Sequence, residues 1–212
     1  MTVLQNTEAL RITTVTEHIG AIVTGVDLAR PVDAPTRKKL YDAAVENGVL
    51  VIRGQAHLTP AQLQAAVEMF GELMEDQNRR YLVDGFPLIS VLDNFHKDSQ
   101  GGAAKVGKNA TWHTDHTNQE MPPKFTVLYA VEVPDKGGPT SVCNSRAAYE
   151  ALPGDLKRKL DGMKTENTLI SSARMQTGNP DIVKAQRESK KPPTVHPLVR
   201  THPETGTKAV WF

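Results

Sequence analysis

Hydrophobic and polar positions follow one another in short blocks over the first half of the chain. Apolar, β-branched blocks bounded by turn residues predict short strands over residues 10–15, 21–28 and 49–52. Between the second and third of these strands, apolar residues recur at helical spacing over 34–47, which predicts a helix with Asp33 as its N-cap and Gly48 at its C-terminal end. Residues 49–52 are apolar on both faces, so we expect this strand in the middle of the fold.

The second half of the chain is also divided into short apolar and polar blocks. The pattern predicts further helices over residues 59–71, 145–152 and 153–160, and further extended segments over 87–92, 125–133, 140–143, 163–170 and 208–212. Residues 195–206 are expected to form a strand that runs into a turn. Gly137-Gly138-Pro139 forms a turn between two of these strands and predicts a hairpin. The chain therefore reads as mainly β with flanking helices, an α+β protein.

Two segments have a different character. Residues 93–111 are polar, glycine-containing and almost free of large apolar groups, which predicts a long active-site loop that closes over a ligand. Residues 171–193 carry scattered lysines and arginines with Pro192-Pro193 and predict a mobile, solvated insertion. We prefer this interpretation to a nucleic-acid patch because no aromatic residue interleaves with the charges.

The candidate chemistry lies directly after the polar loop, at His113 and Asp115. In an extended strand, residues i and i+2 project from the same face, so an imidazole and a carboxylate could converge on one ion. Such a pair supplies two of the three ligands of the 2-His-1-carboxylate site that holds non-haem Fe(II). A zinc site that adds His116 is a weaker alternative, because His116 would point to the opposite face of a strand.

The spacing alone does not establish a metal site. Random placement of 7 His and 24 acidic residues in 212 positions gives about 0.8 His-x-Asp/Glu pairs. Three are present: His96 with Asp98, His113 with Asp115, and His202 with Glu204. The context of each pair must separate them.

Composition narrows the classes of protein. With 212 residues, 39% hydrophobic and 23% charged, the chain is expected to form a single globular domain over residues 1–212. A net charge of +1 without a basic face argues against nucleic acid as a partner. The lone Cys143 fits a reducing compartment, and no signal peptide or membrane-length apolar stretch is found, so we expect a cytoplasmic protein that does not bind membranes. A homo-oligomer is left open.

Several short stretches, in order along nearly the whole chain, resemble the Fe(II)- and 2-oxoglutarate-dependent dioxygenases of the taurine dioxygenase and 2,4-dichlorophenoxyacetate dioxygenase family. Among them are Val51-Ile52-Arg53-Gly54-Gln55, Phe70-Gly71-Glu72-Leu73, Trp112-His113-Thr114-Asp115, Gly137-Gly138-Pro139-Thr140 and the run from His196 to Gly206. So many matches in order are far more specific than any one of them.

The resemblance implies a double-stranded β-helix, or jelly roll, with helices packed outside. It implies that His113 and Asp115 are iron ligands, that Thr140 contacts 2-oxoglutarate, and that Asn109 contacts the primary substrate. The implied reaction uses Fe(II), 2-oxoglutarate and O2 to hydroxylate a small anionic organic molecule, with release of succinate and CO2. It requires no side-chain acid or base, and His196 and His202 match positions that are not iron ligands, so both are interpreted as turn histidines.

The resemblance also sets an expectation for the end of the chain. In the family, the third iron ligand, a histidine, and the arginine that binds 2-oxoglutarate lie in the C-terminal third, beyond the strand that matches residues 208–212. We therefore expect a jelly roll that is incomplete at its C-terminus. The alternative function is a truncated, non-catalytic member that binds metal weakly. Glu75-Asp76 stands where taurine-specific members carry a histidine, so taurine itself is not expected as the substrate.

Overall fold

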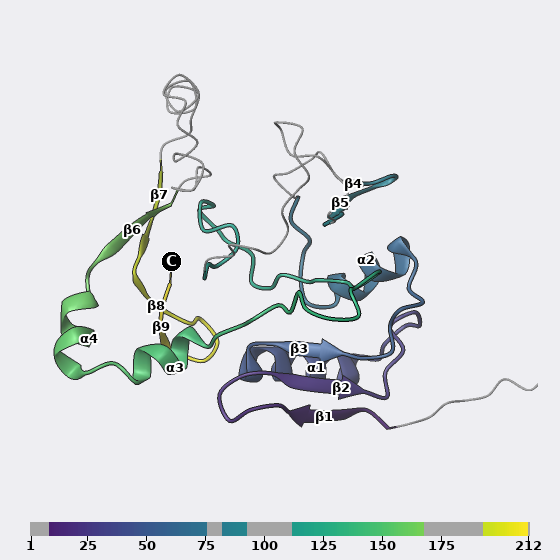
Figure 1. Cartoon of the computed structure of the whole chain (residues 1–212), viewed down its shortest axis with the longest axis horizontal. Helices are drawn as coiled ribbons and strands as arrows, with labels where there is room; N and C mark the ends of the chain where they lie inside the picture. The colour runs from purple at the N-terminus through teal and green to yellow at the C-terminus, as the bar shows by residue number, and fades with distance from the viewer. Residues whose placement is uncertain (1–8, 76–81, 93–111, 168–192, 212) are drawn as a thin grey trace, which may run out of the picture. The chain divides into compact units, whose positions relative to one another are not determined.

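The computed structural model describes residues 9–75, 82–92, 112–167 and 193–211 (Figure 1). They belong to two compact units, the first made of residues up to 111 together with 127–144, the second of residues 112–126 and 145–212. The predicted active-site loop at 93–111, which includes Asn109, and nearly all of the predicted insertion at 171–193 lie outside the described residues.

A three-stranded sheet forms the base of the first unit. Strands β1 (Arg11–Thr14), β2 (Ala21–Thr24) and β3 (Leu50–Ile52) lie in the order β1-β2-β3. β1 runs antiparallel to β2, and β3 runs parallel to β2 with Ala21 opposite Leu50. The prediction that residues 49–52 form a central strand is wrong, because β2 is central in this sheet and Val51 of β3 is 38% exposed.

Helix α1 (Ala34–Asn47) connects β2 to β3 and packs against the sheet (Figure 1). Its bounds agree with the prediction: Asp33 accepts a hydrogen bond from the Thr36 amide at the N-cap, and Gly48 ends the helix at φ 71°. A left-handed φ of this size favours glycine, which lacks a Cβ. Leu40 of α1 and Val23 of β2 are fully buried, so the core of this unit lies between helix and sheet.

The first unit continues with α2 (Pro60–Glu68) and a hairpin of β4 (Leu82–Val83) and β5 (Phe86–Ser90). Thr59 and Gln62 form a capping box at the start of α2, in which each side chain bonds to the backbone of the other. Both α2 and β5 confirm predicted elements, and they pack against each other.

The predicted hairpin of residues 125–133 and 140–143 is wrong, because the structure assigns no strand to these described residues. The side chains of Leu128, Val131 and Val133 are 62%, 88% and 68% exposed. An apolar, β-branched segment becomes a strand only where another strand supplies ladder hydrogen bonds, and no described segment pairs with it here.

The second unit is built from two helices and two short antiparallel pairs of strands. The helices are α3 (Ser145–Glu150) and α4 (Gly154–Leu160), and the pairs are β6 (Lys164–Asn167) with β7 (Thr194–Pro197) and β8 (Val199–Thr201) with β9 (Lys208–Val210). α3 packs against β9. The buried side chains of this unit include Tyr149, Asn167 and His196.

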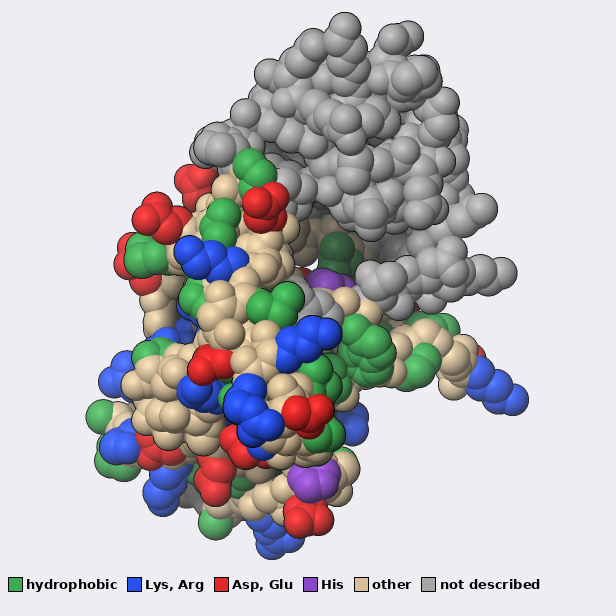
Figure 2. Space-filling view, turned by 90° about the vertical axis from the view of Figure 1, so that its left-hand side faces the viewer, with side chains coloured by type: hydrophobic (Ala, Val, Ile, Leu, Met, Phe, Trp, Pro, Cys, Tyr) green, Lys and Arg blue, Asp and Glu red, His purple; other side chains and the backbone are tan. Residues whose placement is uncertain are grey.

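The described elements form a mixed α and β protein with several small sheets, as the α+β prediction required. On the face shown in Figure 2, acidic, basic and apolar side chains of the described residues are interspersed. In the described part of the chain, every helix is too short or too polar to cross a membrane.

Candidate metal centre

His113 and Asp115 lie in the second unit, at the start of a turn over residues 115–118. The extended geometry from which their convergence was argued is not formed, because residues 112–114 have no regular secondary structure and His116 adopts a left-handed φ of 52°. Their side chains nevertheless meet, with Nε2 of His113 3.2 Å from Oδ1 of Asp115.

The separation of these two donor atoms fits one ion. Two ligand atoms that each lie about 2.1 Å from a metal at a right angle are about 3.0 Å apart. The side chains of His113 and Asp115 are 64% and 41% exposed, so an ion can reach both atoms from solvent. An imidazole nitrogen and a carboxylate oxygen form a donor set suited to divalent transition metals.

Among the described residues, no group of three or more His, Cys, Asp or Glu could hold a metal ion. The zinc site of His113, Asp115 and His116 is therefore not assembled. The pair His113 and Asp115 is the part of the predicted iron site that the structure brings together, and its role as a pair of ligands remains a prediction.

The His202 and Glu204 pair, which has the same spacing, is used differently. Nδ1 of His202 accepts hydrogen bonds from the amides of Glu204 and Thr205, both at 3.3 Å. Oε1 of Glu204 forms an ion pair with Nζ of Lys124 at 2.7 Å. Burial, followed by the positive charge of Arg146, lowers the pKa of His202 below its ordinary value of 6.5. This pair closes the turn between β8 and β9, as the turn interpretation of His202 predicted.

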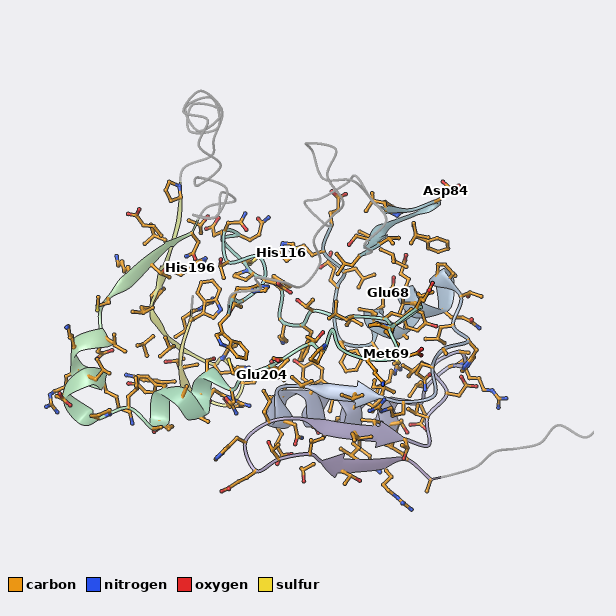
Figure 3. All side chains as sticks on the ribbon, viewed as in Figure 1. Glu68, Met69, Asp84, His116, His196 and Glu204 are labelled. Atoms are coloured by element: carbon orange, nitrogen blue, oxygen red, sulfur yellow. The ribbon has the colours of Figure 1, made fainter. Side chains whose placement is uncertain are left out.

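Strand β7 contacts the chain just after the metal-binding candidates. Oγ1 of Thr194 donates to the carbonyl of Asn118 at 2.6 Å, and Nε2 of His196 bonds to the carbonyl of Gln119 at 2.8 Å. Because a carbonyl oxygen only accepts, Nε2 of His196 carries the proton. Figure 3 shows His196 on β7, beside the segment that contains His116.

The interpretation of His196 as a turn histidine is wrong. It lies within β7, is 6% exposed, and meets the ring of Trp211 edge to face with centroids 4.6 Å apart. The guanidinium of Arg200 covers the same indole ring at 4.4 Å. The only sequence signal was the alternation of Thr194, Val195 and His196, which places the first and third side chains on one face of a strand.

Thr140, the predicted contact of 2-oxoglutarate, lies in the first unit. Its segment, residues 127–144, contains Gly137 and Gly138, whose φ values of 82° and 65° favour glycine. The hydroxyl of Tyr129 holds one end of the segment by donating to the Gln55 carbonyl at 2.8 Å. Nδ2 of Asn144 holds the other end by donating to the His18 carbonyl at 2.6 Å.

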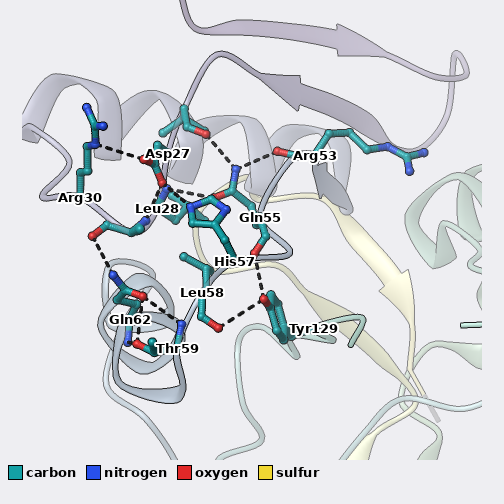
Figure 4. A network of polar contacts seen from close by, with 12 residues as sticks. Asp27, Leu28, Arg30, Arg53, Gln55, His57, Leu58, Thr59, Gln62 and Tyr129 are labelled. Atoms are coloured by element: carbon teal, nitrogen blue, oxygen red, sulfur yellow. Dashed lines mark hydrogen bonds and ion pairs between the residues drawn. The ribbon is translucent and has the colours of Figure 1, made fainter. Parts of the chain in front are cut away.

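Gln55 is the centre of a polar network that connects the loops of the first unit (Figure 4). Its side chain is nearly buried and makes three backbone hydrogen bonds, accepting from the Leu28 amide and donating to the carbonyls of Val26 and Arg53. Nearby, Asp27 accepts a hydrogen bond from His57 at 2.9 Å, which is the largest of the effects that lower the pKa of Asp27.

Comparison with known proteins identifies the class. Residues 11–212 match the model of the taurine catabolism dioxygenase TauD, TfdA family. The chain is 33% identical to an alkylsulfatase of Acinetobacter baylyi, over 99% of this chain and 65% of that protein. It is 34% identical to the alpha-ketoglutarate-dependent 2,4-dichlorophenoxyacetate dioxygenase of Cupriavidus pinatubonensis, over 90% of this chain and 68% of that protein.

A solved structure agrees with the sequence matches. A taurine dioxygenase from Burkholderia xenovorans superposes with a TM-score of 0.68 at 27% identity, over 96% of this chain and 63% of that one. The chain thus spans about two thirds of the length of these relatives. The chain belongs to the TauD, TfdA family of dioxygenases.

Proposed function

We propose that this protein is an Fe(II)- and 2-oxoglutarate-dependent dioxygenase that hydroxylates a small organic anion. One oxygen atom of O2 enters the substrate and the other enters succinate, while 2-oxoglutarate loses CO2. The observation that carries the proposal is the 3.2 Å approach of His113 Nε2 to Asp115 Oδ1, inside a family match that covers residues 11–212.

His113 and Asp115 are proposed to hold the iron through neutral imidazole and carboxylate. Together they supply one negative charge, which leaves a net positive centre that attracts an anionic cosubstrate. When bound, the metal supplies the oxidation chemistry, and the protein orients the reactants and excludes water. The hydroxyl of Thr140 is proposed to donate a hydrogen bond to the carboxylate of 2-oxoglutarate, and Asn109 to contact the substrate.

The substrate class rests on the relatives. Three of them are named as an alkylsulfatase, a 2,4-dichlorophenoxyacetate dioxygenase and a sulfate ester dioxygenase. Sulfate esters and aryloxyacetates share an apolar body and a single anionic end. We propose a molecule of this kind as the substrate, and we propose that both units belong to one dioxygenase domain built on a double-stranded β-helix.

The test is substrate-dependent formation of succinate. The purified chain is incubated with Fe(II), 2-oxoglutarate and O2 and with an alkyl sulfate, an aryloxyacetate or an alkyl sulfonate, and succinate is quantified. The expected result is succinate in excess of the substrate-free reaction for at least one compound. Asp115→Asn should lower this rate by about 100-fold or more, since it removes the charged ligand.

The matched control is Glu204→Gln, which makes the same change in the other described His-x-acid pair and should retain activity. If no compound yields succinate, or if Asp115→Asn is as active as Glu204→Gln, the proposed function is wrong. The first of these outcomes is the one that a non-catalytic member of the family would give.

A further inference from the structure

We propose that Thr194 and His196 are positioning residues for the His113 and Asp115 pair, acting through the turn that follows Asp115. The proposal rests on the proposed metal-binding role of that pair. The hydrogen-bond partners of Thr194 and His196 are the backbone carbonyls of Asn118 and Gln119.

The two contacts fix the backbone of the turn in both position and rotation. Thr194 and His196 are residues i and i+2 of β7, so they project from the same face and bind two successive carbonyls. The peptide group between Asn118 and Gln119 is held at both ends, since its carbonyl accepts from Thr194 and its amide donates to the carbonyl of His116 at 3.0 Å. A peptide group held at both ends cannot rotate without losing a hydrogen bond.

Between this anchor and Asp115, one residue has an unfavourable backbone conformation. His116 has a φ of 52°, a left-handed conformation that residues other than glycine adopt at a cost. Such a conformation persists where the surrounding structure over-determines it. The anchor at Asn118 and Gln119 lies only a few residues beyond Asp115, so it holds the strained residue and, through it, the direction of the Asp115 carboxylate.

Strand β7 is itself held by neighbouring residues of the second unit. β7 pairs with β6, with His196 opposite Thr165 and Thr194 opposite Asn167. Asn167 is 9% exposed, and its Nδ2 donates to the Thr194 carbonyl at 3.4 Å. The His196 ring is fixed by its edge-to-face contact with Trp211. A residue that acts on the ligands through the backbone can set the geometry of a metal site, and loss of such outer partners typically lowers metal affinity 10- to 100-fold.

The test uses the metal-free chain and Co(II) as a spectroscopic probe. Thr194→Val removes the hydroxyl donor and keeps the shape, Thr194→Ser keeps the donor, and Val195→Thr changes the half-exposed opposite face of the same strand. His196→Phe removes the second donor and keeps a ring. Hydrogen–deuterium exchange of residues 112–120 measures how well the turn is held. Co(II) titration, followed by calorimetry and visible absorption, measures the affinity and geometry of the metal site. Thermal melting measures the stability of the fold.

We expect Thr194→Val to speed exchange in residues 112–120 and to weaken Co(II) binding about tenfold, with a changed Co(II) absorption band. Thr194→Ser and Val195→Thr should behave like the unchanged chain. If Thr194→Val speeds exchange or lowers the melting temperature but leaves Co(II) affinity and absorption unchanged, the contacts are merely structural and the proposal is wrong. If Thr194→Val leaves hydrogen–deuterium exchange of residues 112–120 unchanged, the proposed anchor is refuted. This conclusion holds even if His196→Phe impairs folding.

The failure of the proposed function gives a different result. If the unchanged chain binds no Co(II), or if Asp115→Asn binds it equally well, His113 and Asp115 are not a metal site, and both proposals fail. If Co(II) binding depends on Asp115 but not on Thr194 and His196, only the positioning proposal fails.

Discussion

Replacing Gln55 by methionine should destabilise the first unit strongly. Methionine keeps the length of the side chain and removes its amide, so three hydrogen bonds are lost at once: one from the Leu28 amide at 2.9 Å and two to the carbonyls of Val26 and Arg53 at 2.8 and 2.7 Å. The side chain is 8% exposed, so water cannot readily replace the lost partner.

The magnitude follows from these contacts. Each net hydrogen bond contributes about 1 kcal/mol, and three give about 3 kcal/mol, of which the apolar methionine side chain recovers a part. A loss of about 2 to 3 kcal/mol is a large fraction of a typical stability of about 5 to 15 kcal/mol. With an m-value of about 2 kcal/mol per M urea, the unfolding midpoint should fall by about 1 M or slightly more.

The assay is urea unfolding followed by circular dichroism. Gln64→Met is the matched control, because Gln64 makes a single exposed hydrogen bond to Glu68 within α2 and its loss should cost at most about 0.5 kcal/mol. If Gln55→Met loses less than about 1 kcal/mol, or no more than Gln64→Met, then the Gln55 network does not hold the loops together and the reasoning is refuted.

Two further predictions concern local features. Asp33→Ala should lower the free energy of unfolding in urea by about 1 kcal/mol, because it removes the carboxylate that accepts a hydrogen bond from the Thr36 amide at 2.7 Å. Asp33→Ser should retain most of the stability, because serine can also cap a helix. Equal losses in the two variants would contradict the capping role. The lowered pKa of His202 means that the folded state favours the neutral ring, so its contribution is present above pH 6.5 and is lost as the pH falls through the folded-state pKa. The melting temperature should therefore fall less between pH 7.5 and pH 5 in His202→Gln than in the unchanged chain, and equal pH dependence would contradict this.

The sequence by itself determined the elements whose signals are local. The bounds of α1 follow from Asp33, the helical spacing and Gly48, all of which act within a few residues. The approach of His113 to Asp115 was also expected from the sequence, because only one residue separates the two side chains.

Only the tertiary structure decided the features that depend on distant partners. The apolar pattern of residues 125–133 predicted a strand, but a ladder needs a second strand, and no pattern within the segment reveals whether one is present. The place of β3 at one side of the sheet likewise depends on how β2 pairs with both of its neighbours.

His196 is the clearest example of a residue whose contacts depend on distant parts of the chain. Its hydrogen-bond partner, Gln119, lies 77 positions away, and Trp211 reaches it through the pairing of strands. Sequence spacing carries no information about such contacts, because the free energy that forms them comes from burial and hydrogen bonding between separate segments. The order of short matches along the chain singled out the candidate ligands, and only the fold showed that β7 bonds to the turn that follows them.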